Sequence, residues 1–308
     1  MEYNKDPISF EAQADRLIAR GLIADRCTLV KRLEATNYFR FSAYAESFRD
    51  GEHYLPDTTL EKVWRLYTFD HRLRTLCLDA IESIEVQVRT QLAYHFAHDI
   101  GPFEYLNASS FPNFDSGLRD FTRWEQKIKS VVDRTRDPDG KAREDFVVQY
   151  FNDHGDKHDL PPIWMLIELL DFGSTLSFFR GACTNTKKAV SASVGQPDKL
   201  VMSWLLGLNT MRNRCAHHSV LWSWRSPRVM RPNKKKYPEW YSASFPSNRI
   251  GILLTVCRYW LNQIAPTNTW TSRVFELFDQ YPEIDTFKMG LPHHWREHPL
   301  WIDGYLSQ

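Results

Sequence analysis

Apolar residues recur along this chain at steps of three and four positions, which places their side chains on one face of an α-helix. The longest such stripe runs from Leu66 to Leu92. It spans about seven turns, so we expect a long helix that forms the spine of a bundle. Thr58 and Glu61 form a capping-box pattern that would begin this helix, and Gly101 would end it.

Shorter helical patterns lie on both sides of this stripe, and no segment shows convincing strand alternation. The run Trp164–Phe179 is nearly all apolar and predicts one buried helix. Other helices are expected within residues 8–50, 118–135, 143–152, 199–222, 250–264 and 271–281. We therefore expect an all-α protein with an N-terminal helical extension (1–57), a helical core (58–265), and a C-terminal helix and tail (266–308) packed on the core.

The composition fits a protein with a sizeable core that works in a reducing compartment. The chain has 308 residues, of which 43% are apolar. Its five cysteines are scattered, odd in number and without a Cys-x-x-Cys pair, as is typical of reduced thiols in a cytosolic protein. No apolar run reaches the length of a transmembrane helix, and the polar start lacks a signal-peptide pattern. We expect a cytoplasmic protein that does not enter a membrane.

The positive charge of the chain is concentrated in one segment. Overall the net charge is only +1. The segment Lys199–Pro238, however, holds nine Lys and Arg and no Asp or Glu, so the remainder carries 30 basic and 38 acidic residues, a net of −8. Such focused charge indicates either a surface for a polyanion or a basic loop that only keeps the protein soluble.

The start of this basic segment carries the residues of greatest chemical interest, at the end of the expected helix over 199–222. At about 100° per residue, Asn213 and His217 lie within roughly 40° of each other, and each lies some 160° from Cys215. Since Cys215 belongs to the apolar stripe, Asn213 and His217 should point away from the core. The long side chain of Arg212 can reach the same patch.

These three residue types suit RNA cleavage without a metal. When a ribose 2′-hydroxyl attacks the adjacent phosphorus, a group that titrates near neutral pH can transfer the proton, and histidine is such a group. The planar guanidinium of arginine can stabilise the charged phosphorane. An amide such as that of Asn213 can orient either the histidine or the phosphate. Two copies facing each other across a dimer would supply a denser site.

The stretch Arg212-Asn213-…-His217 resembles the Arg-x4–6-His motif of HEPN ribonucleases. Three further stretches resemble blocks of the bacterial abortive-infection (Abi-like, AbiD/AbiF) family in the same order: Asn37–Tyr44, Trp164–Phe179, and Met289–Trp295 followed by Pro299-Leu300-Trp301. The resemblance implies an all-α HEPN-type helical bundle with N-terminal and C-terminal helical extensions. It also implies a dimeric endoribonuclease toxin used against phage, without metal or other cofactor, and some relatives are restrained by a small structured non-coding RNA.

Under this resemblance Arg212, Asn213 and His217 would be the catalytic residues, with Arg214 and His218 in support. Two other interpretations remain. The pair Arg212 and His217 also fits a capped, solvated helix face. The same basic surface would also suit a non-catalytic sensor that binds RNA or a phage protein.

A second set of candidates would bind RNA along the proline-containing segment that follows. Its cations alternate with Trp224, Tyr237, Trp240 and Tyr241, a pattern that fits bases stacking on rings and phosphates meeting cations. An ordinary surface loop with its aromatic residues in the core fits equally well. The candidate cations are Arg225, Arg228, Arg231, Lys234, Lys235 and Lys236. Arg40 is a further candidate, although its aromatic surroundings favour a role in tying its helix to the core by hydrogen bonds.

Overall fold

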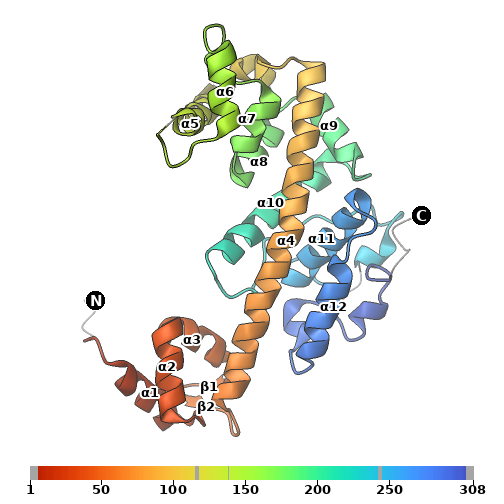
Figure 1. Cartoon of the computed structure of the whole chain (residues 1–308). Helices are drawn as coiled ribbons and strands as arrows, with labels where there is room; N and C mark the ends of the chain where they lie inside the picture. Colours follow the sequence, from red (N-terminus) through yellow and green to blue (C-terminus); the bar gives the residue numbers. More distant parts are fainter. Residues whose placement is uncertain (1–5, 115–117, 138, 242–244, 303–308) are drawn as a thin grey trace.

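The computed structural model describes residues 6–114, 118–137, 139–241 and 245–302. These residues form twelve α-helices and a sheet of two very short strands, so the expected all-α class is confirmed. The elements are arranged around α4 (Leu60–Asp99), which runs through the molecule as its spine (Figure 1). None of the described helices combines the length and apolar character needed to cross a bilayer.

Helix α4 is longer than its apolar stripe, with 40 residues and a length of about 60 Å. It begins one residue later than the capping-box pattern predicted. The side chain of Thr59 accepts from the amide of Lys62, whereas the Thr58 hydroxyl donates to the carbonyl of Leu55 at 2.7 Å. Two adjacent threonines offer the same cap chemistry, and the loop geometry before the helix selects the second.

The N-terminal elements pack at the beginning of α4. They are α1 (Phe10–Ala19), α2 (Arg26–Thr36), α3 (Tyr38–Ala45) and the antiparallel strands β1 (Arg49–Asp50) and β2 (His53–Tyr54). The strands pair with Arg49 opposite Tyr54. Asn37, whose φ is +67°, separates α2 from α3 and caps α3 by accepting from the amide of Phe39.

A second group of helices lies at the other end of α4: α5 (Leu118–Arg136), α6 (Asp145–His154), α7 (Ile163–Leu169), α8 (Phe172–Gly181) and α9 (Thr184–Ala192). The prediction of one helix over Trp164–Phe179 is wrong. Leu170 is extended, and Asp171 starts a new helix by accepting from the amide of Ser174 at 2.7 Å. An apolar pattern cannot reveal this break, because both halves are largely buried.

Three helices complete the bundle: α10 (Asp198–Ala216), α11 (Ile250–Ile264) and α12 (Trp270–Gln280). In Figure 1, α11 and α12 lie on one side of α4, whereas α1–α3 and α5–α8 lie on the other. The chain after α12 returns to this core, since Trp295 and Trp301 are buried and the Trp301 indole donates to Thr255 at 3.1 Å.

A buried ion pair on α4 joins three distant segments. Asp70 and Arg74 are almost fully buried and paired one helical turn apart. Tyr44 of α3 donates to Asp70 at 2.7 Å, and so do the amides of Leu221 and Trp222, at 3.0 and 2.7 Å. Burial raises the pKa of Asp70, and the adjacent Arg74 guanidinium opposes this rise. The pair therefore fastens α3 and the segment after α10 to the spine.

We predict that Asp70→Ala lowers the free energy of unfolding by about 3–5 kcal/mol, because it leaves the Arg74 charge buried without its partner. Urea denaturation measures the loss. The matched control is Asp79→Ala on the same helix, which breaks a half-exposed pair with Arg273 and should cost about 1 kcal/mol or less. Equal losses in the two variants would contradict a special role for the buried pair.

Candidate active site

The candidate catalytic residues occupy the last turn of α10 and the turn that follows it. The helix ends at Ala216, so the predicted continuation to Trp222 is wrong. His218 adopts a left-handed conformation (φ +56°), its amide donates to Cys215, and the amide of Ser219 donates to Arg214. This is the hydrogen-bond pattern of a Schellman C-cap. Leu221 and Trp222 are buried because the chain turns back onto α4, where their amides meet Asp70.

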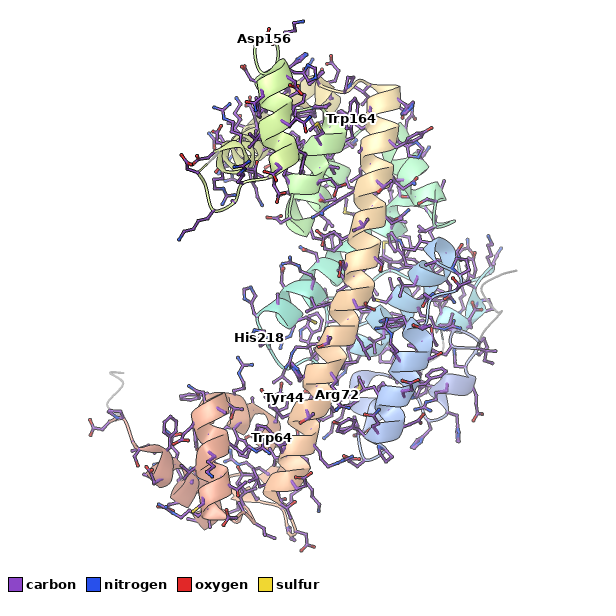
Figure 2. All side chains as sticks on the ribbon, viewed as in Figure 1. Tyr44, Trp64, Arg72, Asp156, Trp164 and His218 are labelled. Atoms are coloured by element: carbon purple, nitrogen blue, oxygen red, sulfur yellow. The ribbon has the colours of Figure 1, made fainter. Side chains whose placement is uncertain are left out.

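Arg212, Asn213 and His217, which we call the motif patch, lie at one end of α10. Asn213 and His217 are exposed and Cys215 is buried, as the helical spacing predicted. Arg212 is half-buried, and its guanidinium lies 3.5 Å from the Asn213 side-chain oxygen. In Figure 2, the neighbouring His218 lies on the side of α4 toward α1–α3, away from α12. The motif patch is therefore accessible to a large substrate.

The carboxyl group of Glu85, on α4, lines the same cavity as Arg212. Arg212 lines a cavity of about 320 Å³ together with Glu82, Glu85 and Arg89. Glu85 forms an ion pair with Arg89, which also donates to the carbonyl of Leu170. Burial raises the pKa of Glu85, and the charges of Arg89 and Arg212 oppose this rise.

Glu85 thus forms a salt bridge within the bundle, one helical turn from Arg89. Its proximity to Arg212 was not foreseen, because the two residues are far apart in the sequence and share no motif. The site thus offers a cation beside a partly buried carboxyl group, and the exposed His217 lies five residues after Arg212 in the chain.

The two supporting candidates, Arg214 and His218, form hydrogen bonds that fix the turn after α10. Arg214 donates twice to the carbonyl of Val220, at 3.2 and 2.7 Å, and its guanidinium lies over the ring of Trp224. The His218 carbonyl accepts a hydrogen bond from Arg40, which ties α3 to the turn. Arg214 and Arg40 therefore hold the position of the turn. The supporting role of Arg214 and His218 in catalysis, and contact between Arg40 and RNA, stay predictions.

A family model described as Abi-like protein matches residues 31–223, which is more than half of the chain and includes the motif patch. The chain belongs to the Abi-like protein family. This membership points to abortive-infection defence. No curated protein and no solved structure matches the chain.

In this Abi-like protein the part of the basic segment that leads to its three consecutive lysines is anchored away from the motif patch. The Trp204 indole donates to the carbonyl of Met230 at 2.9 Å, and the amide of Met230 donates to Ser203. Ser203 precedes His217 by 14 residues of α10, or about 21 Å along the helix axis. The exposed Lys234, Lys235 and Lys236 follow the anchored Met230 by four to six positions.

The aromatic residues of the basic segment mostly face the core. Trp240 is fully buried against Trp204, so for this residue the structure selects the second alternative, packing in the core, over stacking on RNA bases. Tyr241 remains partly exposed, next to Arg231 and Lys234. Arg231 donates to the carbonyl of Phe245, and burial lowers its pKa. The exposed cations that remain as RNA-binding candidates are Arg225, Arg228, Lys234, Lys235 and Lys236.

The residues that the structure describes contain no group of three or more His, Cys, Asp or Glu side chains suited to hold a metal ion.

We predict that replacement by glycine changes the free energy of unfolding in opposite directions at the two histidines of the turn. His218 has a φ of +56°, which strains a residue with a Cβ atom, whereas His217 has a φ of −86°. His218→Gly should therefore unfold at higher urea concentration than His217→Gly, with a difference of about 1–2 kcal/mol in the free energy of unfolding. The reverse order would contradict the C-cap geometry.

Proposed function

We propose that this Abi-like protein is an abortive-infection toxin that cleaves RNA as a metal-independent endoribonuclease of the HEPN type. The observation that carries the proposal is the motif patch: a guanidinium, an amide and an imidazole at the accessible end of α10. Arg212 and Asn213 lie in the last turns of α10, and His217 begins the turn that Asp70, Arg74 and Arg40 hold in place. A fixed arrangement of this kind suits transition-state stabilisation, because the groups need little reorganisation during the reaction.

In the proposed reaction a ribose 2′-oxygen attacks the adjacent phosphorus, and the bond from phosphorus to the 5′-oxygen breaks. His217 accepts the 2′-hydroxyl proton or donates a proton to the departing oxygen. Arg212 neutralises the charge of the phosphorane, and Asn213 orients the phosphate. The products are a 2′,3′-cyclic phosphate and a 5′-hydroxyl. No metal or other cofactor takes part.

Each chain contributes one His217 to the motif patch, whereas the reaction requires both the uptake and the delivery of a proton. We infer a homodimer in which two motif patches face each other and supply one imidazole to each task. Such a toxin must be held inactive before infection, and a small non-coding RNA bound to the exposed cations would restrain it.

The second candidate function is a defence sensor that binds RNA or a phage protein without cleaving it. It is favoured by the exposed Lys234, Lys235 and Lys236, which follow a segment anchored at Ser203, in the first half of α10. Such a sensor would bind RNA through these lysines and would leave the RNA intact.

We predict that Arg212→Ala and His217→Ala each abolish toxicity and slow RNA cleavage by roughly 100-fold or more, because each removes a group that acts in the transition state. Cleavage by the wild type should persist in EDTA and leave 2′,3′-cyclic phosphate ends. Circular dichroism should show an unchanged helical fold. The control is Lys199→Ala, an exposed cation on the same helix, which should retain full activity. Full toxicity of both motif variants would refute the assignment.

We predict that replacing Lys234, Lys235 and Lys236 together by Ala weakens RNA binding without abolishing cleavage at saturating RNA. If each lysine neutralises one phosphate, the slope of log affinity against log salt should become shallower by about 2. Titrations of fluorescent single-stranded RNA at several salt concentrations give the slope. An unchanged slope would show that these lysines lie outside the RNA path.

A further inference from the structure

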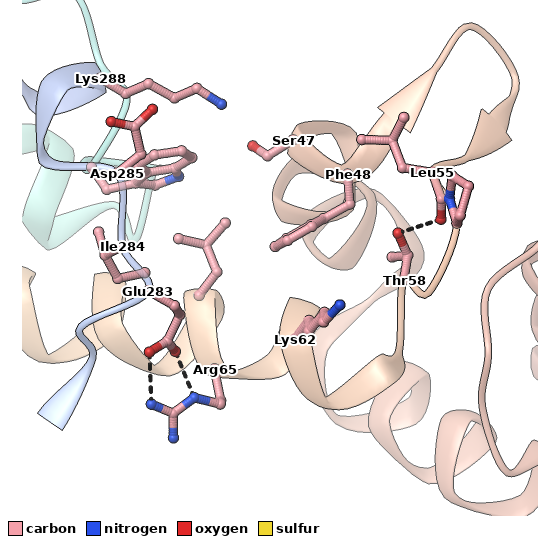
Figure 3. Close-up of a pocket in the computed structure, with 13 residues that line it drawn as sticks. Ser47, Phe48, Leu55, Thr58, Lys62, Arg65, Glu283, Ile284, Asp285 and Lys288 are labelled. Carbon is pink, nitrogen blue, oxygen red and sulfur yellow. Dashed lines mark hydrogen bonds and ion pairs between the residues drawn. The ribbon is translucent and has the colours of Figure 1, made fainter.

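A second cavity lies where the N-terminal extension, the start of α4 and the segment before the C-terminal tail meet. Its volume is about 560 Å³, which is within the usual range for small-molecule sites. Residues that are far apart in the sequence line it, and Figure 3 shows several of them around the central space. We call it the junction cavity and define it by Ser47, Phe48, Lys62, Trp222, Ile284 and Lys288.

The walls of the junction cavity are mainly apolar. Phe48 and Leu55 come from the N-terminal extension, Leu66 comes from α4, and Ile284 comes from the segment after α12. The ring of Phe48 points into the space in Figure 3. Such a surface favours the hydrocarbon or aromatic body of a ligand, because burying that body removes apolar area from water.

The polar rim of the cavity carries an excess of positive charge. Lys62 and Lys288 are both exposed lining residues, and the Lys288 ammonium extends toward Ser47 across the space in Figure 3. The carboxylate of Glu283 is engaged by Arg65, at 2.5 and 3.1 Å. That leaves Asp285, which accepts from the amide of Phe287 at 3.0 Å. The Lys62 ammonium donates to the backbone carbonyl of Asp57 at 2.8 Å, and neither lysine forms an ion pair with a described carboxylate. The rim therefore carries a net positive charge and favours an anion.

Trp222 connects this cavity to the turn that carries the motif patch. Its side chain is only 3% exposed, and its indole N–H has no hydrogen-bond acceptor among the residues that the structure describes. The backbone amide of the same residue donates to Asp70 at 2.7 Å. One wall of the cavity is therefore part of the segment that the buried ion pair holds.

We propose that the junction cavity binds a small organic anion, with its apolar body against Phe48 and Ile284 and its phosphate, sulfonate or carboxylate group at the basic rim to which Lys62 and Lys288 contribute. Binding ties together the N-terminal extension, α4 and the segment containing Trp222, and so stabilises the turn after α10. This site is separate from the motif patch, and its existence does not depend on RNA cleavage.

The test uses the full chain with 1-anilinonaphthalene-8-sulfonate, a fluorescent anion with an aromatic body. We expect saturable binding to one site and displacement by octyl phosphate. Inorganic phosphate, which lacks the apolar body, and octyltrimethylammonium, which has the opposite charge, should not displace it. Displacement by octyltrimethylammonium as effective as that by octyl phosphate would overturn the proposal.

Variants locate the binding site. Lys62→Ala combined with Lys288→Ala should weaken binding at least tenfold, and Ser47→Trp should abolish it by filling the space. The matched control is Phe287→Ala, which removes an adjacent aromatic ring that is 70% exposed and does not line the cavity. A thermal unfolding curve for each variant shows whether the protein is folded at the temperature at which dye binding is measured. Unchanged binding in both the lysine pair and Ser47→Trp would overturn the assignment.

Hydrogen exchange tests the connection to the turn. Octyl phosphate should slow amide hydrogen exchange in a peptide that contains Leu221 and Trp222. A ligand that binds only while this segment is packed against α4 makes its local unfolding less frequent. A peptide from α6, at the other end of α4, is the internal control. Binding without any change at Leu221 and Trp222 would refute the stabilisation of the turn.

Discussion

The structure depends on one buried carboxylate. Asp70 accepts hydrogen bonds from the side chains of Tyr44 and Arg74 and from the amides of Leu221 and Trp222. These donors offset the large cost of removing its charge from water. Since the four donors come from three different parts of the chain, their common acceptor decides how those parts are joined.

The most important consequence concerns the end of α10. The helix stops at Ala216, and the chain reaches α4 within a few residues because Leu221 and Trp222 must meet Asp70. Arg40 and Arg214 fasten the same turn from two other directions. The backbone of the turn at His217 is therefore fixed by several hydrogen bonds, although the side chain of His217 is exposed to solvent. The exposed His217 is thus positioned through a turn that the buried Asp70, Leu221 and Trp222 fix to α4.

Two cavities lie close to this turn and differ in character. The cavity beside Arg212 is lined by the charged residues Glu82, Glu85 and Arg89, whereas the junction cavity has apolar walls and a basic rim. The first lies next to the proposed chemistry, and the second reaches the turn through Trp222. The segment 217–222 connects the two proposals, because His217 belongs to the motif patch and Trp222 lines the junction cavity. RNA cleavage and anion binding can still be measured independently.

The sequence by itself determined what depends on local periodicity. The all-α class, the long spine and the outward direction of Asn213 and His217 all follow from a repeat of 3.6 residues. Only the tertiary structure decided where α10 ends, where the run over Trp164–Phe179 breaks, that Trp240 is buried and that Glu85 lies beside Arg212. A buried Leu221 gives the same apolar pattern whether the helix continues or the chain folds back. The choice rests on Asp70, which lies 151 residues earlier in the chain and which no local pattern can reveal.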